Sequence, residues 1–171
     1  MNVSIRPARP DDLDFLVELY GDEDVRPFLA ASGAYERDGI AERIARTDEE
    51  PDAGGLLIVE AGGERAGAMA WERKNERSRI AHAGGIAVHP RFRGRRLADD
   101  AARLLQRHLI GNLGFHRIEL EIYGFNERAQ RHAERAGWIR EGVKRKAYLR
   151  GDDWVDGVLY ALVAEDLDEP R

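Results

Sequence analysis

The sequence has no cysteine, which excludes disulfides, thiolate metal sites and cysteine nucleophiles together. No stretch approaches the roughly 18 apolar residues that a membrane span needs. The segment at residues 1–15 has no apolar run that would serve as a signal peptide. We therefore expect a cytoplasmic protein that has no membrane partner.

Excess positive charge is also lacking. The formal net charge is -5 over 171 residues, so the chain as a whole is not built to neutralise a phosphate backbone. Aromatic residues make up 8% of the chain and are seldom interleaved with basic ones, and no nucleic-acid-binding module is present. The five histidines show no metal-ligand spacing. We expect neither a nucleic-acid partner nor a metal.

What is present is the pattern of one mixed α/β domain over residues 1–171. We expect a mainly antiparallel, twisted sheet of six to seven strands flanked by four helices. Apolar alternation and turn residues predict the strands, and helical spacing predicts the helices. The predicted strands are 3–8, the two arms of a hairpin at 55–75, 79–90, 116–124 and the two arms of a hairpin at 144–163. The predicted helices are 10–20, 39–50, 98–113 and 126–137, with a looser segment at 21–36.

The segment Gly85–Leu105 carries the clearest chemical signal. The strand "GIAVHP" runs into a turn rich in arginine and glycine, which opens a helix at Ala98 or Asp99. A helix N-terminus offers unpaired N–H groups to an anion, and arginine adds forked donors that fit phosphate. A phosphate cradle is favoured over a solvated basic patch or a nucleic-acid contact. The glycine pair before this strand end, Gly84–Gly85, predicts a bulge.

The segment resembles a signature of the GNAT superfamily of N-acetyltransferases, Arg/Gln-x-x-Gly-x-Gly/Ala. The chain reads Arg93, Gly94, Arg95, Arg96, Leu97, Ala98, so Arg96 replaces the central glycine. A second family signature follows the next strand, where the chain has Asn126, Ala129, Ala133, Gly137 and Trp138 and lacks the family tyrosine at Ala133. The phrases "LGFHRIELEIYGFNERA" and "YLRGDDWVD" are similar to the RimJ/RimL-like branch, whose members acetylate ribosomal-protein N-termini and whose relatives acetylate polyamines.

The resemblance implies that acetyl-CoA is the cosubstrate and lies where the fourth and fifth strands separate. The pantetheine arm is expected along Ile86, Ala87 and Val88, where a backbone N–H would polarise the thioester carbonyl. The pyrophosphate is expected on the N–H groups of residues 94–98, and Asn126 is expected to contact the pantetheine arm or a water. The resemblance also makes a homodimer an expectation.

Acetyl transfer to an amine requires the ammonium to lose a proton before attack. The resemblance implies Glu121 as the base, five residues before Asn126, although a carboxylate paired with a neighbouring arginine is an equal alternative. The usual acid is the missing tyrosine. Tyr148, Tyr123 and His132 are the substitutes, and Tyr148 is retained because His132 points about 100 degrees away from Ala133 around its helix. His82 lies on the fourth strand near the expected opening.

The resulting hypothesis is an acetyl-CoA-dependent N-acetyltransferase that acts on a primary amine of a protein N-terminus, a polyamine or another small amine. The alternative is a GNAT-fold CoA-binding module or a non-catalytic sensor or interaction module with a degenerate active site, and it rests on Arg96 and Ala133. Asp99 and Asp100 are expected only to complement the helix dipole. Acidic residues in the first helix and final hairpin are expected to form an ordinary acidic surface rather than a site for a cationic acceptor; they are Asp11, Asp12, Asp14, Glu18, Asp22, Glu23, Asp24, Asp152, Asp153 and Asp156.

Overall fold

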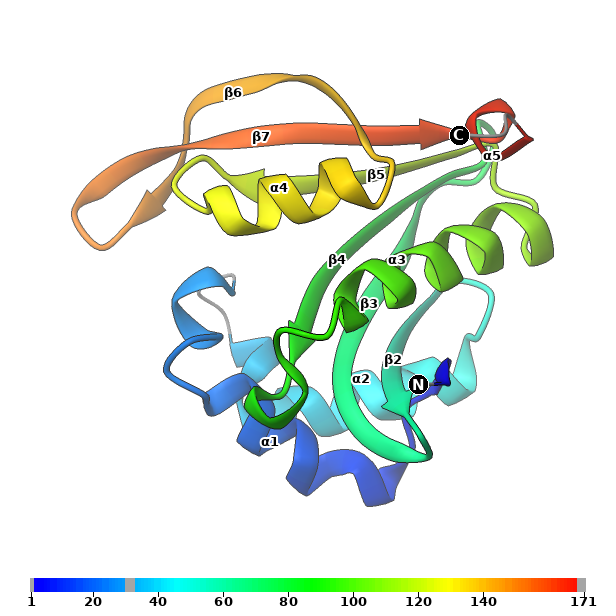
Figure 1. Ribbon diagram of the computed structural model, residues 1–171, viewed down its shortest axis with the longest axis vertical. Coiled ribbons are helices and arrows are strands. Elements are labelled where there is room, and N and C mark those ends of the chain that lie inside the picture. The colour runs from blue at the N-terminus through cyan, green and yellow to red at the C-terminus, as the bar shows by residue number, and fades with distance from the viewer. Residues whose placement is uncertain (1, 30–32, 169–171) are drawn as a thin grey trace.

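A computed structural model describes residues 2–29 and 33–168 (Figure 1). Part of the predicted looser segment, residues 30–32, lies outside the described residues. The described strands form one seven-stranded sheet in the order β1-β2-β3-β4-β5-β7-β6. Its strands are β1 (Val3–Pro7), β2 (Gly54–Ala61), β3 (Glu64–Asn75), β4 (Ile80–Val88), β5 (Arg117–Tyr123), β6 (Ile139–Arg150) and β7 (Asp153–Val163). Only β4 and β5 pair in parallel, so the prediction of a mainly antiparallel sheet is confirmed.

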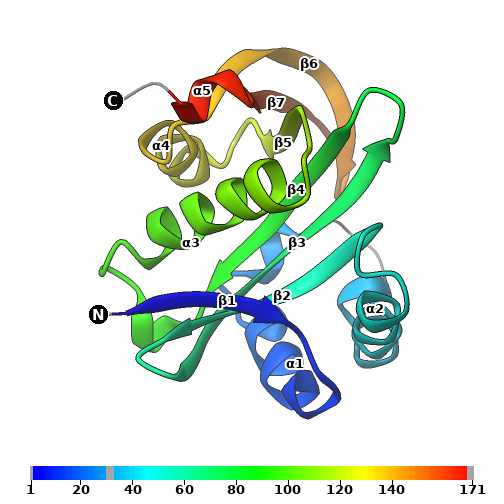
Figure 2. The same ribbon diagram turned by 90° about the vertical axis from the view of Figure 1, so that its right-hand side faces the viewer.

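Helices cover both faces of the sheet. Figure 2 shows α1 and α2 on one side and α3 and α4 on the other. The helices are α1 (Leu13–Gly21), α2 (Arg37–Glu49), α3 (Leu97–Gln106), α4 (Glu127–Arg135) and the short α5 (Glu165–Asp168). Short 3-10 turns are η1 (Pro10–Asp12), η2 (Arg26–Phe28), η3 (Gly33–Tyr35) and η4 (Pro90–Phe92).

Several element boundaries differ from the sequence prediction, most clearly at α3 and β6. The helix expected from Ala98 or Asp99 begins at Leu97, and from Arg107 to Asn112 it continues as a π-helical segment, η5. The strand expected from Lys144 begins at Ile139, because Ile139 and Arg140 already pair with β7. The sequence did not predict this earlier start, because β6 is a largely exposed edge strand whose polar sequence has little apolar alternation.

Two hydrophobic cores follow from the alternation of side chains along the strands. Between the sheet and α3, the fully buried side chains include Ile118 and Leu109. Between the sheet and α1 and α2, they include Leu16, Leu19 and Ile58. Burying each such side chain contributes about 1.5–3 kcal/mol, so the two cores hold both helical layers firmly to the sheet.

The parallel pair β4 and β5 separates soon after it forms. It makes three residue pairs, Ile80 with Arg117, Ala81 with Ile118 and His82 with Glu119. Beyond His82, β4 carries one residue more than β3, because Ala70 pairs with Gly84 and Ala68 with Ala87. Gly85 has a φ of +63°, which glycine adopts without a steric penalty. This bulge confirms the expectation for Gly84–Gly85, and β4 then curves away from β5 (Figure 1).

A buried carboxylate fixes the start of α1 to the sheet. The Asp12 side chain is fully buried and accepts hydrogen bonds from Arg6 (2.7 and 2.9 Å), from Arg65 (2.6 Å) and from the Arg9 N–H (2.8 Å). Burial alone would raise the pKa of Asp12, but these donors outweigh it and lower the pKa to about 2.

We predict that Asp12→Asn lowers the free energy of unfolding by about 3 kcal/mol at pH 7, because two guanidinium groups lose their counter-ion. The folded-state pKa is below the unfolded one, so the stabilisation exists above about pH 4 and disappears as the pH falls towards 2. Urea unfolding at several pH values measures this. The control Asp14→Asn removes an ion pair whose carboxylate is 87% exposed, and we expect a change below about 1 kcal/mol. A deficit in Asp12→Asn that is the same at pH 7 and pH 3 would contradict the assignment.

Candidate active site

A cleft of about 1070 Å³ opens where β4 and β5 separate. It runs between the N-terminus of α3 and α4 on one side and α2 and the loop after α1 on the other. Of the residues predicted from the sequence for the site, only Arg95 is outside its lining. Those that line it are Ile86, Ala87, Val88, Arg93, Gly94, Arg96, Leu97, Ala98, Glu121, Asn126 and Tyr148.

The turn between η4 and α3 keeps its backbone N–H groups open. Gly94 and Arg96 have φ values of +78° and +56°, so the turn is left-handed at both positions. Within the described residues, none of the N–H groups of residues 94–98 donates a hydrogen bond, and the first helical bonds come from the N–H groups of Asp99 and Asp100 to the Arg96 carbonyl. Such a set of free donors at a helix N-terminus is suited to a phosphate.

Arg96 adopts a left-handed backbone conformation, which glycine adopts without a steric penalty. The left-handed region costs a residue with a side chain roughly 1–2 kcal/mol. The cradle geometry is therefore kept with arginine at this position, and the exposed side chain adds a positive charge to the lining of the cleft.

The other two arginines of the signature have different partners. Arg93 donates to the Val88 carbonyl (3.1 Å), to Asp24 (2.7 Å) and to Asp22 (2.8 Å). Arg95 turns its guanidinium towards the Phe92 ring, 6.0 Å from the ring centroid. The expectation that these two residues bind the cofactor stays a prediction. The donors of Arg93 are already used to tie the β4–α3 turn to the loop after α1.

Two further predicted cofactor residues have structural roles. The Leu97 side chain is buried in the core under α3, so only its N–H can face an anion. The Asn126 side-chain oxygen accepts from the Ala129 N–H (3.1 Å) and caps α4. The side-chain nitrogen of Asn126 has no partner among the described residues and stays available to the cleft.

Asp99 was expected only to complement the helix dipole, and this was wrong. Its side chain is 6% exposed and pairs with His132 (2.7 Å) and with Arg135 (3.2 Å), so it joins α3 to α4. Sequence reasoning could not see this pairing, because it spans two helices. The same contact engages Nδ1 of His132, which also lines the cleft, so the role of His132 as a substitute acid stays a prediction.

Glu121 lies on the β5 face that turns towards α2. Its Oε2 accepts from Lys144 Nζ (2.8 Å). Its Oε1 is buried and has no hydrogen-bond partner among the described residues. Gly157 on β7 makes this placement possible, because a Cβ there would collide with Oε1. One carboxylate oxygen is thus held by a lysine, and the other is buried against Gly157.

Tyr148 lies beside Glu121 and lines the cleft, with its ring 5.6 Å from that of Tyr123. Burial, the hydrogen-bonding interaction of the hydroxyl with the Glu121 carboxylate and the negative charge of Glu121 raise the pKa of Tyr148 to about 12. An alkyl thiol such as cysteine has a pKa of about 8.5. A full proton transfer from Tyr148 to a departing thiolate is therefore uphill, and the hydroxyl is better suited to donate a hydrogen bond.

Ala133, where the family tyrosine would stand, is 1% exposed and packed in the core near Trp138.

Tyr35, from η3, is a side chain at the site that the sequence analysis did not single out. Its hydroxyl lies 3.8 Å from the position that a Cβ on Gly85 would occupy, at the bulge itself. No sequence signal marked Tyr35, because it reaches the site from a loop on the opposite side of the cleft.

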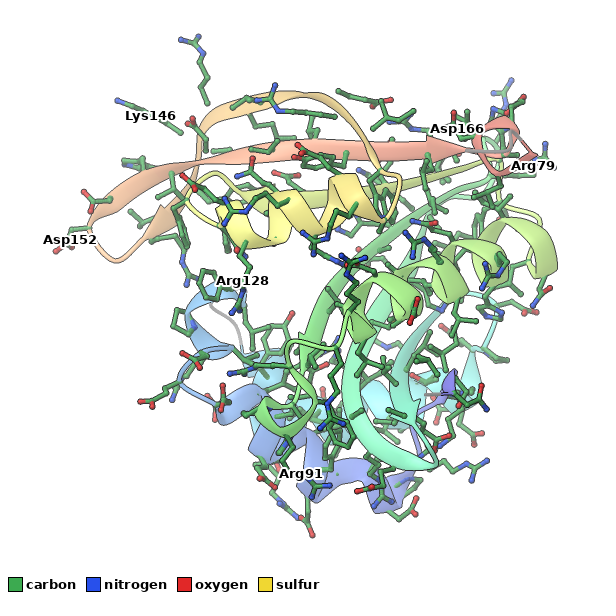
Figure 3. The ribbon with its side chains drawn as sticks, in the orientation of Figure 1. Arg79, Arg91, Arg128, Lys146, Asp152 and Asp166 are labelled. Carbon is green, nitrogen blue, oxygen red and sulfur yellow. The ribbon has the colours of Figure 1, made fainter. Side chains whose placement is uncertain are left out.

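A polar and aromatic contact closes the cleft between the loop after α1 and the β6–β7 hairpin. Arg150 donates to the carbonyl groups of Leu29 (2.7 Å) and Pro27. Arg128 points from α4 towards this loop (Figure 3), and its guanidinium lies 5.9 Å from the Phe28 ring centroid. The loop is therefore fixed by arginines from two directions.

The acidic residues of the N-terminal half are mostly paired within the protein. Asp14 pairs with Arg37 and Glu18 with His89, while Asp22 and Asp24 pair with Arg93. Of the ten acidic residues considered above, only Asp24 lines the cleft. This agrees with an ordinary acidic surface, and the α2 side of the cleft instead mixes cations with carboxylates: Arg43, Arg46, Glu50, Glu72 and Glu121.

Residues 2–139 match the family model of the acetyltransferase (GNAT) domain. The chain therefore belongs to the GNAT acetyltransferase family. It is similar to an uncharacterised N-acetyltransferase of the SPbeta prophage of Bacillus subtilis, YokL, with 24% identity over 83 residues. The match covers 48% of this chain and 47% of YokL, which is about half the length of each protein.

Solved structures agree over nearly the whole chain. The spermidine N-acetyltransferase of Vibrio cholerae, in complex with CoA and spermine, has a TM-score of 0.86 and 18% identity, and the alignment covers 98% of each chain. RimJ of Mycobacterium smegmatis, in complex with CoA-disulfide, has a TM-score of 0.84 and 19% identity. The alignment covers 98% of this chain and 84% of the RimJ chain. At these identities the likeness establishes the fold, and these structures come from the branch that the sequence resembles.

Two features are absent from the described residues. None of their helices is long and apolar enough to cross a membrane. Over the same residues, no group of three or more histidine, aspartate or glutamate side chains is arranged to hold a metal ion.

We predict that Arg96→Gly stabilises the protein by about 1 kcal/mol, because glycine adopts the left-handed conformation without strain. If the guanidinium of Arg96 contributes to the phosphate site, the variant also binds acetyl-CoA several-fold more weakly. Thermal unfolding and calorimetry measure the two effects separately.

The matched control is Arg95→Gly, because Arg95 lies outside the cleft lining and its φ is not positive. We expect this control to lose about 0.5–1 kcal/mol of stability and to keep its affinity for acetyl-CoA. Equal affinities of Arg96→Gly and the unaltered protein would show that Arg96 only faces solvent.

Proposed function

We propose that the protein is an acetyl-CoA-dependent N-acetyltransferase that moves an acetyl group to a primary amine. The observation that carries this proposal is the cleft at the separated β4 and β5, which joins two kinds of surface. One end has the free N–H groups of residues 94–98, and the other has the partly free carboxylate of Glu121.

The cosubstrate fits this arrangement. The bulged stretch Ile86–Val88 lines the cleft and faces no strand on the β5 side, since the β4–β5 pairing ends at His82. Its backbone groups would bind the pantetheine arm, and the free N–H groups of the α3 turn would bind the pyrophosphate. Acetyl-CoA supplies a thioester whose carbonyl carbon accepts the amine.

Glu121 is the candidate base of this reaction. Its unpartnered Oε1 is placed to accept a proton from the acceptor ammonium, and its charge attracts that ammonium. The Lys144 ion pair holds the carboxylate in position. We propose Tyr148 as a hydrogen-bond donor to the leaving sulfur. It is not proposed as a strong acid, because its raised pKa makes a full proton transfer to the thiolate uphill.

The acceptor is a primary amine of a protein N-terminus, a polyamine or another small amine. One of the solved structures named above is a spermidine N-acetyltransferase and another is RimJ. They support this range of acceptor amines and do not narrow it. The mixture of arginines and carboxylates on the α2 side argues against a site built only for polycations. A single domain over residues 1–171, a homodimer and a cytoplasmic location stay predictions.

Calorimetry with acetyl-CoA, followed by CoA release with a panel of amines, tests the function. We expect binding, and release with at least one amine among peptides with free N-termini, polyamines and monoamines. No binding at millimolar acetyl-CoA would contradict the proposal. Binding without release for any amine would favour the alternative, a CoA-binding module whose active site is degenerate at Ala133.

We predict that Glu121→Gln lowers kcat by about 100-fold, within the usual range for the loss of a general base. It also raises the KM for the amine, because a negative charge is lost. The matched control is Glu119→Gln. Glu119 shares the strand face but pairs with Lys74 and Arg117 and does not line the cleft, so we expect less than about a threefold change. Equal losses in the two variants would remove Glu121 as the base.

A further inference from the structure

Tyr35 reaches the β4 bulge from the opposite wall of the cleft. It is the last residue of η3, outside the sheet, and it lines the cleft. Its hydroxyl lies 3.8 Å from the position that a Cβ on Gly85 would occupy. Gly85 has the positive φ of the bulge and directly precedes the stretch Ile86–Val88. A phenol hydroxyl therefore lies over the backbone where the proposed pantetheine stretch begins.

The hydroxyl of Tyr35 is available as a hydrogen-bond donor. It makes no hydrogen bond to any of the described residues, and the side chain is half-buried at the cleft wall. A tyrosine hydroxyl carries one proton that it can donate. Inside a protein cleft such a hydrogen bond is electrostatically stronger than it is in water. A ligand oxygen at the bulge would therefore find a donor on the side of the cleft that faces β4.

Two neighbours hold the Tyr35 ring in place. The buried ring of Tyr20 meets it edge-on, with 5.1 Å between the two ring centroids. The guanidinium of Arg43, from α2, lies 5.2 Å from the Tyr35 ring centroid in a cation–π contact. Arg43 also donates to the Ala34 carbonyl at 3.5 Å. The hydroxyl is thus carried by a fixed ring, and a positive charge lies on the same side of the cleft.

The proposed reaction places negative charge on an oxygen. When the amine attacks, the C–N bond forms and the π electrons of the thioester carbonyl move to its oxygen. They return as the C–S bond breaks, and sulfur leaves with its electron pair. Of the two protons that the acceptor ammonium loses, Glu121 accepts the first and passes it to solvent, and the second ends on the thiolate. A donor fixed at the carbonyl oxygen lowers the barrier of this step.

We propose that Tyr35 is a further catalytic residue, whose hydroxyl donates a hydrogen bond to the carbonyl oxygen of bound acetyl-CoA. This inference rests on the proposed acetyltransferase function. The hydrogen bond strengthens as the oxygen gains charge, so it stabilises the transition state more than the bound substrate. Tyr35 keeps its proton throughout. Its hydroxyl acts from the cleft wall, together with a backbone N–H of Ile86–Val88 on β4, and the positive charge of Arg43 favours the same oxygen.

This role differs from those proposed for Glu121 and Tyr148. Glu121 extends from β5 and acts on the amine, and Tyr148 extends from β6 and acts on the sulfur. Tyr35 instead lies over β4 itself. Loss of its hydroxyl should therefore leave the binding of both substrates intact and slow only the step in which the carbonyl oxygen carries charge.

The test compares Tyr35→Phe with the unaltered enzyme. The variant keeps the ring and its contacts with Tyr20 and Arg43, so we expect it to fold and to bind acetyl-CoA within about twofold in calorimetry. We expect kcat to fall about 100-fold, the usual loss for one oxyanion donor, and the KM for the amine to stay the same. Infrared spectra of bound acetyl-CoA with an isotopically labelled carbonyl give a second readout. Loss of the hydrogen bond should move the carbonyl band to higher wavenumber.

The matched control is Tyr160→Phe. It also removes one tyrosine hydroxyl, which donates to Glu134 (3.2 Å) outside the cleft lining, and we expect kcat and the carbonyl band to stay unchanged. An active enzyme whose Tyr35→Phe variant keeps kcat, or loses kcat without a shift of the carbonyl band, would overturn the role of Tyr35 alone. An unaltered protein that binds acetyl-CoA and releases no CoA with any amine would overturn the proposed function, and this inference with it.

Discussion

The rest of the site depends on one constraint, the early end of the pairing between β4 and β5. Three residue pairs hold the two strands together, and the extra residue at Gly84–Gly85 then turns β4 away. Because the strands separate inside a continuous sheet, backbone groups of β4 face the cleft from the middle of the protein. The helices α3 and α4 and the loop after α1 are then arranged around this opening, as Figure 1 shows.

Ion pairs between distant segments hold the walls of the cleft in place. Arg93 connects the α3 turn to Asp22 and Asp24, and Asp99 connects α3 to α4. Arg150 fixes the loop after α1 to the final hairpin. These contacts use charged side chains of both signs within the protein. Among the groups without a partner in the described part of the chain are the N–H groups of residues 94–98 and Oε1 of Glu121, which the proposed reaction uses.

The sequence predicted the sheet, the four main helices and the bulge, because each of these rests on local signals. Apolar periodicity marks strands and helices, and the glycine pair with the Arg/Gly turn marks the bulge and the helix start. The sequence could not predict the partners of Arg93 and Asp99, nor the approach of Tyr35 to Gly85. These contacts join segments far apart in the chain, so no local pattern encodes them.

The central claim is that acetyl-CoA binds along the free side of β4 and on the α3 turn. Hydrogen–deuterium exchange of the amides with and without acetyl-CoA tests this most directly. The account predicts slower exchange at residues 86–88 and 94–98, and no change at the edge strand β6 away from the cleft. Unchanged exchange at both segments at saturating acetyl-CoA would contradict the account.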